Sequence, residues 1–229
     1  MLGIVVELIV SWLLLRYIEG KDLLALGIAP TKERFGNLVF GIVASTATCA
    51  IYYLVVGYAA DGNWTINKEF SLQPFLYGSW WTLKSVLFEE LIFRGALLYI
   101  LIRKLGLKAG CIISALCFGI YHWFSFNVIG DTFQMIMILV LTGVAGLMFA
   151  FAFGITKSLY LPIGLHFGWN FVSAVIFSNG PLGRQLLVLE GAGQASETSS
   201  IGLTIFQLLA LPLIVTWYLR KAWKEESAA

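Results

Sequence analysis

Charged side chains are scarce in this sequence. Of its 229 residues, 12% are charged and 59% are hydrophobic, whereas a soluble globular domain carries about 25% charged and about 45–50% apolar residues. A chain of this size cannot bury so much apolar surface in a water-soluble core. The composition therefore excludes an ordinary soluble domain and predicts an integral membrane protein that has the lipid bilayer as its solvent.

Basic blocks and paired cysteines are also lacking. The net charge is only +2, and no run of lysine and arginine suggests a nucleic-acid partner. Three cysteines, Cys49, Cys111 and Cys117, lie singly in apolar stretches without a CxxC motif. We interpret them as packing residues, which argues against a disulfide framework or a cysteine metal site.

Hydrophobic segments of about 20 residues, long enough to cross a bilayer as helices, recur along the chain. They predict an all-α, polytopic transmembrane bundle with seven spans, eight being the alternative, in one domain that covers residues 1–229. Glu7 interrupts the first segment. The predicted spans are 2–18, 35–59, 75–102, 109–128, 132–154, 159–178 and 201–220.

The placement of lysine and arginine predicts how the chain is oriented. The linkers after the first, third and fifth spans and the C-terminal tail hold most of these residues, and the opposite side holds only Lys68 and Arg184. Because cytoplasmic loops are enriched in lysine and arginine, we expect the N-terminus outside and the C-terminus in the cytoplasm. The compact loops favour a prokaryotic cell membrane.

Ionisable side chains inside the membrane are costly, so they mark candidate functional sites. The third span holds Glu89, Glu90 and Arg94. On a helix, Glu90 and Arg94 are i,i+4 neighbours on one face, whereas Glu89 is rotated by about 100° from Glu90. The spacing predicts that Arg94 neutralises Glu90 and leaves Glu89 free to act as a base.

The sequence has only two histidines, and both fall inside predicted spans. His122 lies in the fourth span, and His166 lies in the sixth, where Asn170 follows at i,i+4 on the same helix face. Gly164 and Gly168 beside this pair form a GxxxG pattern, which lets a neighbouring helix approach closely. Three helices are thus expected to present polar groups at membrane depth.

Three short motifs follow one another on these three segments. They are EExxxR at Glu89, Glu90 and Arg94, FxxxH at Phe118 and His122, and HxxxN at His166 and Asn170. In this order they resemble the motif set of the CAAX-protease and bacteriocin-processing family, also called CPBP or Abi. Its members are intramembrane glutamic endopeptidases related to type II CAAX prenyl endopeptidases. The resemblance covers about residues 80–175, which we take as the motif-bearing core.

The resemblance implies an intramembrane endopeptidase that uses glutamate. Glu89 would activate the attacking water as a general base, and His122 would orient that water or polarise the substrate carbonyl. His166 and Asn170 would donate hydrogen bonds to the tetrahedral oxyanion. No cofactor and no metal are implied. The substrate would be a membrane-associated peptide or protein, prenylated in the eukaryotic relatives.

The remaining motif residues are assigned to site support, Glu90 and Arg94 by the same resemblance and Phe118 by its place one turn before His122. Glu90 and Arg94 would form a structural ion pair that fixes the third span. Phe118 would be a packing wall beside His122.

Other functions are compatible with the same residues. Two histidines and two glutamates suit zinc, so a zinc-dependent membrane peptidase is an alternative, although no HExxH motif is present. A non-catalytic immunity or partner protein is a second alternative. A transporter is a third, disfavoured because the sequence shows no internal repeat and because we expect span 75–102 to be unbroken.

Overall fold

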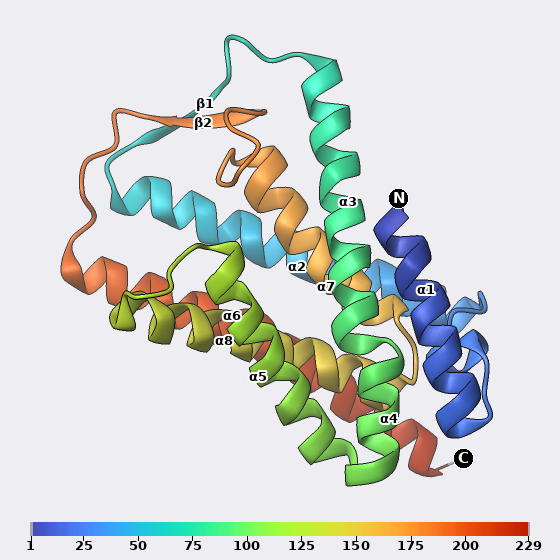
Figure 1. Ribbon diagram of the computed structural model, residues 1–229. Helices are drawn as coiled ribbons and strands as arrows, with labels where there is room; N and C mark the ends of the chain where they lie inside the picture. Colours follow the sequence, from blue (N-terminus) through green and yellow to red (C-terminus); the bar gives the residue numbers. More distant parts are fainter. Residues whose placement is uncertain (1, 229) are drawn as a thin grey trace.

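The computed structural model describes residues 2–228 and the side chains of residues 2–221. Helices dominate the part of the chain that it describes (Figure 1). The α-helices are α1 (Leu2–Leu14), α2 (Lys32–Ala59), α3 (Leu72–Arg94), α4 (Ala96–Leu105), α5 (Leu107–Ser125), α6 (Thr132–Thr156), α7 (Tyr160–Phe171) and α8 (Glu197–Ala228). π-Helical turns follow α1 at Leu15–Glu19 and α7 at Val172–Ile176, and a 3-10 turn spans Leu23–Leu26.

The predicted all-α class holds apart from one small sheet. Strands β1 (Asn63–Ile66) and β2 (Leu187–Glu190) pair antiparallel, with Asn63 opposite Glu190. The loop 178–200, which is rich in glycine, serine and glutamine, therefore contains a paired strand. This sheet joins the segment before α3 to the segment before α8.

Four helices in the described part of the chain are long and apolar enough to cross a membrane by themselves: α2, α5, α6 and α8. Helices α1 and α7 have only 13 and 12 residues, although their π-helical turns extend them. Helix α3 has 23 residues but carries four charged side chains. The structure is therefore a helical membrane protein in which some predicted spans depend on neighbouring helices to hide polar groups.

The third predicted span is not one helix. We expected a continuous helix over 75–102, but α3 ends at Arg94 and α4 begins at Ala96. Gly95 has φ −78° and ψ −137°, which is not helical. A Cβ atom at this position would clash with the carbonyl oxygen of Leu91, so only glycine fits the break. The break removes one of the two reasons given above against a transporter.

Helices α4 and α5 form a hairpin that turns at Gly106, below α3 in Figure 1. Gly106 has φ +84°, in the left-handed region that glycine enters without a steric cost. The hairpin returns the chain towards the C-terminal half of α3, where Ser114 of α5 donates a hydrogen bond to the carbonyl of Phe93 at 2.7 Å.

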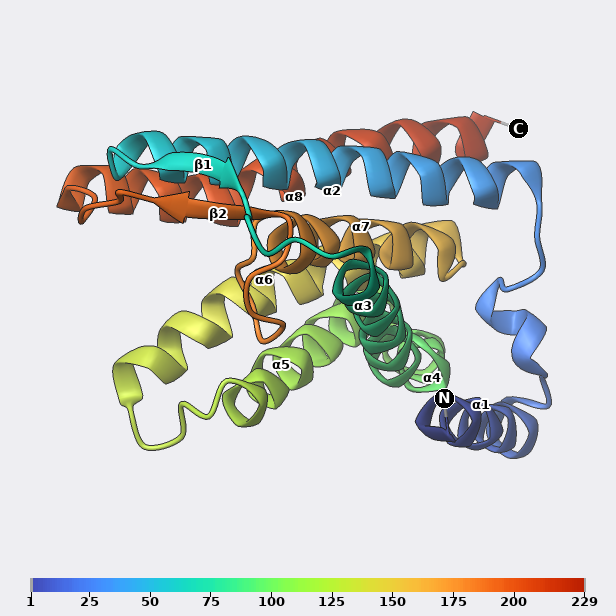
Figure 2. The same ribbon diagram turned by 90° about the horizontal axis from the view of Figure 1, so that it is seen from above.

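Helices α2, α7 and α8 form the opposite side of the molecule, with α2 and α8 side by side and α7 against α2 (Figure 2). Glycine makes the α2–α7 contact close: a Cβ on Gly164 would lie 2.5 Å from the carbonyl oxygen of Leu38, and one on Gly41 would lie 2.9 Å from that of Leu161. Gly168 faces Ser45 equally closely. The close approach predicted from the GxxxG pattern is confirmed.

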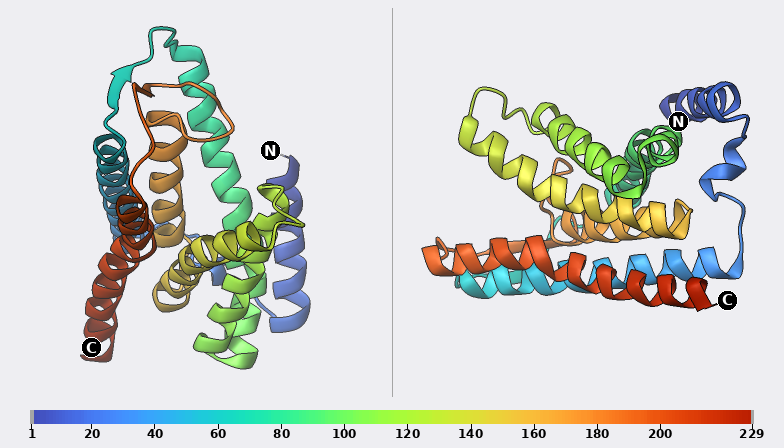
Figure 3. Two further views of the ribbon diagram at one scale, coloured as in Figure 1. Left: turned by 90° about the vertical axis from the view of Figure 1, so that its left-hand side faces the viewer. Right: turned by 90° about the horizontal axis from the view of Figure 1, so that it is seen from below.

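Helix α1 lies at the edge of the bundle beside α3 and α4 (Figure 3). Leu15 and Leu26, which follow α1, are fully buried in a core cluster with Leu91 of α3 and Cys111 of α5. The start of the chain is thereby packed against the helices that carry the motifs.

Candidate active site

The α4–α5 hairpin brings Glu89 and His122 to the same level. Glu89 precedes Gly106 by 17 residues and His122 follows it by 16, so the two arms are nearly equal in length. His166 joins them from α7, six residues after its start at Tyr160. Polar groups predicted on three separate spans thus meet at one place.

The predicted ion pair between Glu90 and Arg94 is present. Both side chains are fully buried, and Arg94 Nη1 lies 3.2 Å from Glu90 Oε1. The i,i+4 spacing on α3 sets this contact. Arg94 therefore balances the charge of one of the two adjacent glutamates.

Aromatic rings enclose the Arg94 guanidinium. Its central carbon lies 4.1 Å from the ring centroid of Phe118 and 5.1 Å from that of Phe149, distances at which a cation is attracted to the ring face. Nη2 also donates to the carbonyl of Gly146 at 3.4 Å. Phe118 thus packs against Arg94 as well as against His122, whose ring centroid is 4.4 Å away.

His166 is held by the same Glu90 carboxylate. Its Nδ1 lies 2.7 Å from Glu90 Oε1, and its ring stacks on Phe149 at 4.9 Å between centroids. An ionised carboxylate can only accept hydrogen bonds, so Nδ1 carries the hydrogen and donates. The other ring nitrogen, Nε2, is directed to Glu89, 3.8 Å from Oε2.

His122 is anchored in a parallel manner. Its Nδ1 lies 2.7 Å from the backbone carbonyl of Phe118, which also can only accept, so Nδ1 again donates. Its Nε2 lies 3.9 Å from Oε2 of Glu89. Both imidazoles thus turn Nε2 towards one carboxylate oxygen.

Glu89 is the carboxylate on which these groups converge. Its side chain is 13% exposed. Ser85, one turn earlier on α3, donates to Oε1 at 3.4 Å, while Oε2 has no hydrogen-bond partner among the described residues. The two distances to Oε2 exceed a direct hydrogen bond. The division predicted for α3, with Glu90 paired to Arg94 and Glu89 apart from it, matches this geometry.

Asn170 is less tied to the cluster than the other motif residues. It lies one turn after His166 on α7 and is half-buried. No hydrogen bond from its amide to another residue occurs in the described part of the chain. The structure therefore places Asn170 on the helix face beside the cluster without linking it to Glu89.

Two supporting residues were not found from the sequence. Ser85 could have been found, because it is i,i+4 to Glu89 on the same helix. Phe149, which stacks on His166 and faces Arg94, could not, because it lies in an apolar stretch of α6 in which no pattern separates it from its neighbours.

The zinc alternative draws its four candidate ligands from this cluster. Among the residues whose side chains are described, no group of three or more histidine, cysteine, aspartate or glutamate side chains could hold a metal ion. Two of the four candidate zinc ligands, Glu90 and His166, are bonded to one another, and Arg94 contacts Glu90 as well.

Comparison with known proteins gives a match to a family model over part of the chain. Residues 70–172 match the family described as type II CAAX prenyl endopeptidase Rce1-like. The matched region contains the EExxxR, FxxxH and HxxxN motifs, and the resemblance drawn from those motifs is confirmed. No curated protein and no solved structure matches the chain.

Proposed function

We propose that this chain, a member of the CAAX-protease family by its residues 70–172, hydrolyses a peptide bond in a membrane-associated or lipid-modified substrate. The family is one of endopeptidases, and four helices in the described residues are long and apolar enough to cross a membrane. The observation that carries the proposal is the unpartnered Oε2 of Glu89, which the Nε2 atoms of His122 and His166 face at 3.9 and 3.8 Å.

Glu89 is the proposed general base. Gaps of 3.8–3.9 Å between polar atoms suit a water that bonds to both sides. Glu89 Oε2 takes a proton from this water while the water oxygen attacks the carbonyl carbon of the substrate. When the tetrahedral intermediate collapses, the carbon–nitrogen bond breaks and Glu89 returns the proton to the departing amine. The carboxylate is regenerated and no other reactant is needed.

The two histidines differ in what holds Nδ1, and this difference separates their proposed roles. His122 donates Nδ1–H to a backbone carbonyl, which leaves Nε2 of the neutral ring as an acceptor, and we assign this atom to orienting the water. Donation by Nε2 of His166 requires a hydrogen on this atom as well as on Nδ1, and the Glu90 and Glu89 carboxylates lie on either side of the ring. In that form Nε2 donates to the oxyanion of the intermediate.

The remaining motif residues complete the proposed site. Asn170, beside His166 on α7, donates a second hydrogen bond to the oxyanion when substrate is bound. Glu90, Arg94 and Phe118 do not touch the substrate in this proposal. They fix the position of His166 relative to the C-terminal end of α3. The buried contacts among Glu90, Arg94, Phe118 and His166 support this role.

Contacts between loops support seven spans, with residues 1–229 as one protease domain whose motif-bearing core is about 80–175. Glu19, after α1, lies 3.6 Å from Arg103 and 3.5 Å from Lys104 at the end of α4. Ser158, after α6, donates to the carbonyl of Gly27 at 2.9 Å. The linkers that follow the first, third and fifth predicted spans therefore lie close to one another.

The β1–β2 sheet joins the linker after the second predicted span to the linker after the sixth. This pairing also supports spans that alternate in direction across the membrane. An even number of crossings must separate two strands that pair on one side of a membrane. Helices α3, α5, α6 and α7 supply four if α4, with 10 residues, does not cross. With the lysine and arginine bias, the N-terminus is outside and the C-terminus is cytoplasmic, in a prokaryotic cell membrane.

Cleavage of lipidated and unmodified membrane peptides by the purified protein, read by mass spectrometry, tests the function. Replacing a general base lowers the rate by about 100- to 10,000-fold, so Glu89→Gln should abolish products that the unaltered protein forms. Glu33→Gln, at the exposed start of α2, is the matched control and should cleave normally. Equal cleavage by Glu89→Gln and the unaltered protein would contradict the assignment.

The non-catalytic alternative predicts a different outcome. An immunity or partner protein would keep its cellular phenotype after Glu89, His122 and His166 are each replaced. A peptidase would lose the phenotype together with the products.

A further inference from the structure

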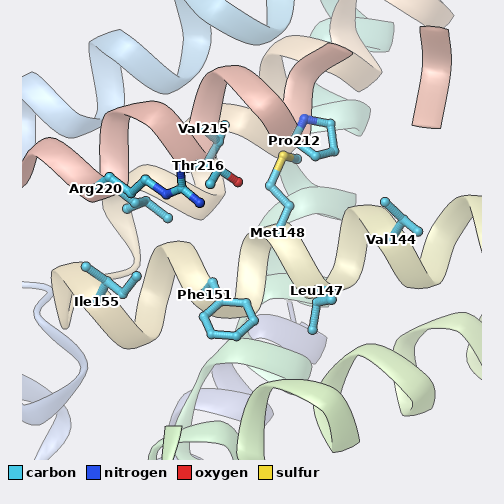
Figure 4. A pocket seen from close by; sticks show the side chains of 10 residues that line it. Val144, Leu147, Met148, Phe151, Ile155, Pro212, Val215, Thr216 and Arg220 are labelled. Carbon is cyan, nitrogen blue, oxygen red and sulfur yellow. The ribbon is translucent and has the colours of Figure 1, made fainter. Parts of the chain in front are cut away.

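A groove runs between α6 and α8, on the side of α6 away from Glu89. Its volume is about 440 Å³, within the size range of small-molecule sites. The wall consists of apolar side chains with one cation and one hydroxyl: Val144, Leu147, Met148, Phe151, Ile155, Pro212, Val215, Thr216, Leu219 and Arg220 (Figure 4). An apolar groove with one positive charge is complementary to a ligand that has an apolar part and one negative charge.

Pro212 of α8 lies in the wall of the groove. It lies inside the helix, where it cannot donate to the carbonyl of Leu208 and its ring crowds that residue. Kinks at proline are common for this reason. Figure 4 shows Pro212 towards one end of the groove and Arg220 at the other. The charge therefore lies at the end of the groove and not along its length.

Arg220 is exposed and lies at the last turn of the apolar part of α8, which runs over Glu197–Lys221. It forms no ion pair with any residue whose side chain the structure describes. At this position an arginine reaches the level of lipid headgroups. A ligand with an anionic head and an apolar tail would match the groove along its whole length.

We propose that this groove binds an anionic phospholipid of the surrounding bilayer, with the phosphate at Arg220 and one acyl chain along the α6 wall towards Val144 and Pro212. Basic pockets between membrane helices bind anionic headgroups in this way. Charge complementarity selects this occupant over a second copy of the chain. Two copies in one membrane have the same orientation, so a twofold axis along the membrane normal through the groove would place two Arg220 side chains at the same level.

The geometry also separates the groove from the catalytic cluster. Met148 lines the groove, whereas the next residue, Phe149, stacks on His166. Gly146, whose carbonyl accepts from Arg94, likewise lies on the inner face of α6. Helix α6 thus has the groove on one face and the Glu90–Arg94–His166 contacts on the other, so the groove does not lead to Glu89.

Retention of lipid by the purified protein tests the proposal. The protein is taken from vesicles of equal phosphatidylglycerol and phosphatidylcholine into mild detergent, and bound lipid is measured by native mass spectrometry. The unaltered protein should retain phosphatidylglycerol in preference to phosphatidylcholine. Loss of one cation near the membrane surface weakens the binding of an anionic headgroup by about fivefold. Arg220→Gln should therefore lower the amount of retained phosphatidylglycerol by about that factor.

Two further variants separate the head from the tail. Lys221→Gln removes the adjacent charge, which does not line the groove, and should retain phosphatidylglycerol normally. Val144→Phe fills the end of the groove proposed to hold the acyl chain. It should lower the retention of both lipids and leave the preference for phosphatidylglycerol over phosphatidylcholine unchanged. Equal retention of the two lipids by the unaltered protein would overturn the proposal. So would equal effects of Arg220→Gln and Lys221→Gln, or displacement of phosphatidylglycerol by a lipidated peptide.

Discussion

Replacing Arg94 with glutamine removes the cation that balances the buried Glu90 carboxylate. Loss of one member of a buried ion pair costs about 3–5 kcal/mol, because the other charge is left uncompensated. Two features favour the lower value. His166 still donates to Glu90, and Nε and Nη1 of Arg94 make no aligned hydrogen bond that the substitution would lose. We therefore expect Arg94→Gln to lower the free energy of unfolding by about 3 kcal/mol.

Thermal unfolding of the purified protein in detergent measures this effect. A change of 3 kcal/mol corresponds to a Tm lower by about 6–12 °C for a chain of this length. Lys108→Gln, which removes an exposed cation before the motif region of α5, should leave Tm unchanged. The double variant Glu90→Gln/Arg94→Gln removes both charges and should recover much of the loss, because no uncompensated ion remains.

The reasoning fails if Arg94→Gln melts within about 2 °C of the unaltered protein, which would mean that less than about 1 kcal/mol depends on the pair. It fails equally if the double variant is less stable than Arg94→Gln alone. Either result would indicate that Glu90 is not charged in the folded protein or is reached by water.

Three further outcomes are expected. Gly164→Ala should lower the free energy of unfolding by about 1–3 kcal/mol, because the added methyl group would overpack against Leu38. The control is Gly36→Ala, whose methyl group would meet no atom within 4 Å. In a thermal melting experiment it should be neutral or stabilising. Peptide cleavage should survive treatment with a metal chelator, and a loss of activity that zinc restores would point to the metallopeptidase alternative. In a cysteine-free background, membrane-impermeant thiol reagents should label Gln194→Cys from outside intact cells and Lys108→Cys only after lysis; labelling of both from one side would contradict seven alternating spans.

Much of the chemistry could be predicted because it depends on local helix geometry. The Glu90–Arg94 pair follows from i,i+4 spacing, and the close α2–α7 approach follows from Gly164 and Gly168. The resemblance to the type II CAAX prenyl endopeptidase family, whose model matches residues 70–172, could also be drawn from the three motifs alone, because their order along the chain is read directly from the sequence.

The assembly of the site could not be predicted, because it depends on where helices break. From the sequence, Glu89 was placed in a continuous helix over 75–102, which leaves its depth relative to His166 undetermined. The break at Gly95 and the turn at Gly106 set the level of Glu89 relative to His122, and the start of α7 at Tyr160 sets that of His166. The anchoring of Nδ1 in both histidines depends on which acceptors lie nearby, namely Glu90 and the Phe118 carbonyl, and such tertiary contacts leave no periodic pattern.

The β1–β2 pairing also has a consequence for how the protein is made. Strand β1 leaves the ribosome about 120 residues before its partner β2. At synthesis rates of about 5–20 residues per second, the delay is roughly 6–24 seconds. During this interval β1 is an unpaired edge, while α3 to α7 are inserted one after another. The sheet can close only when the last motif helix has been delivered, so its formation coincides with completion of the cluster around Glu89.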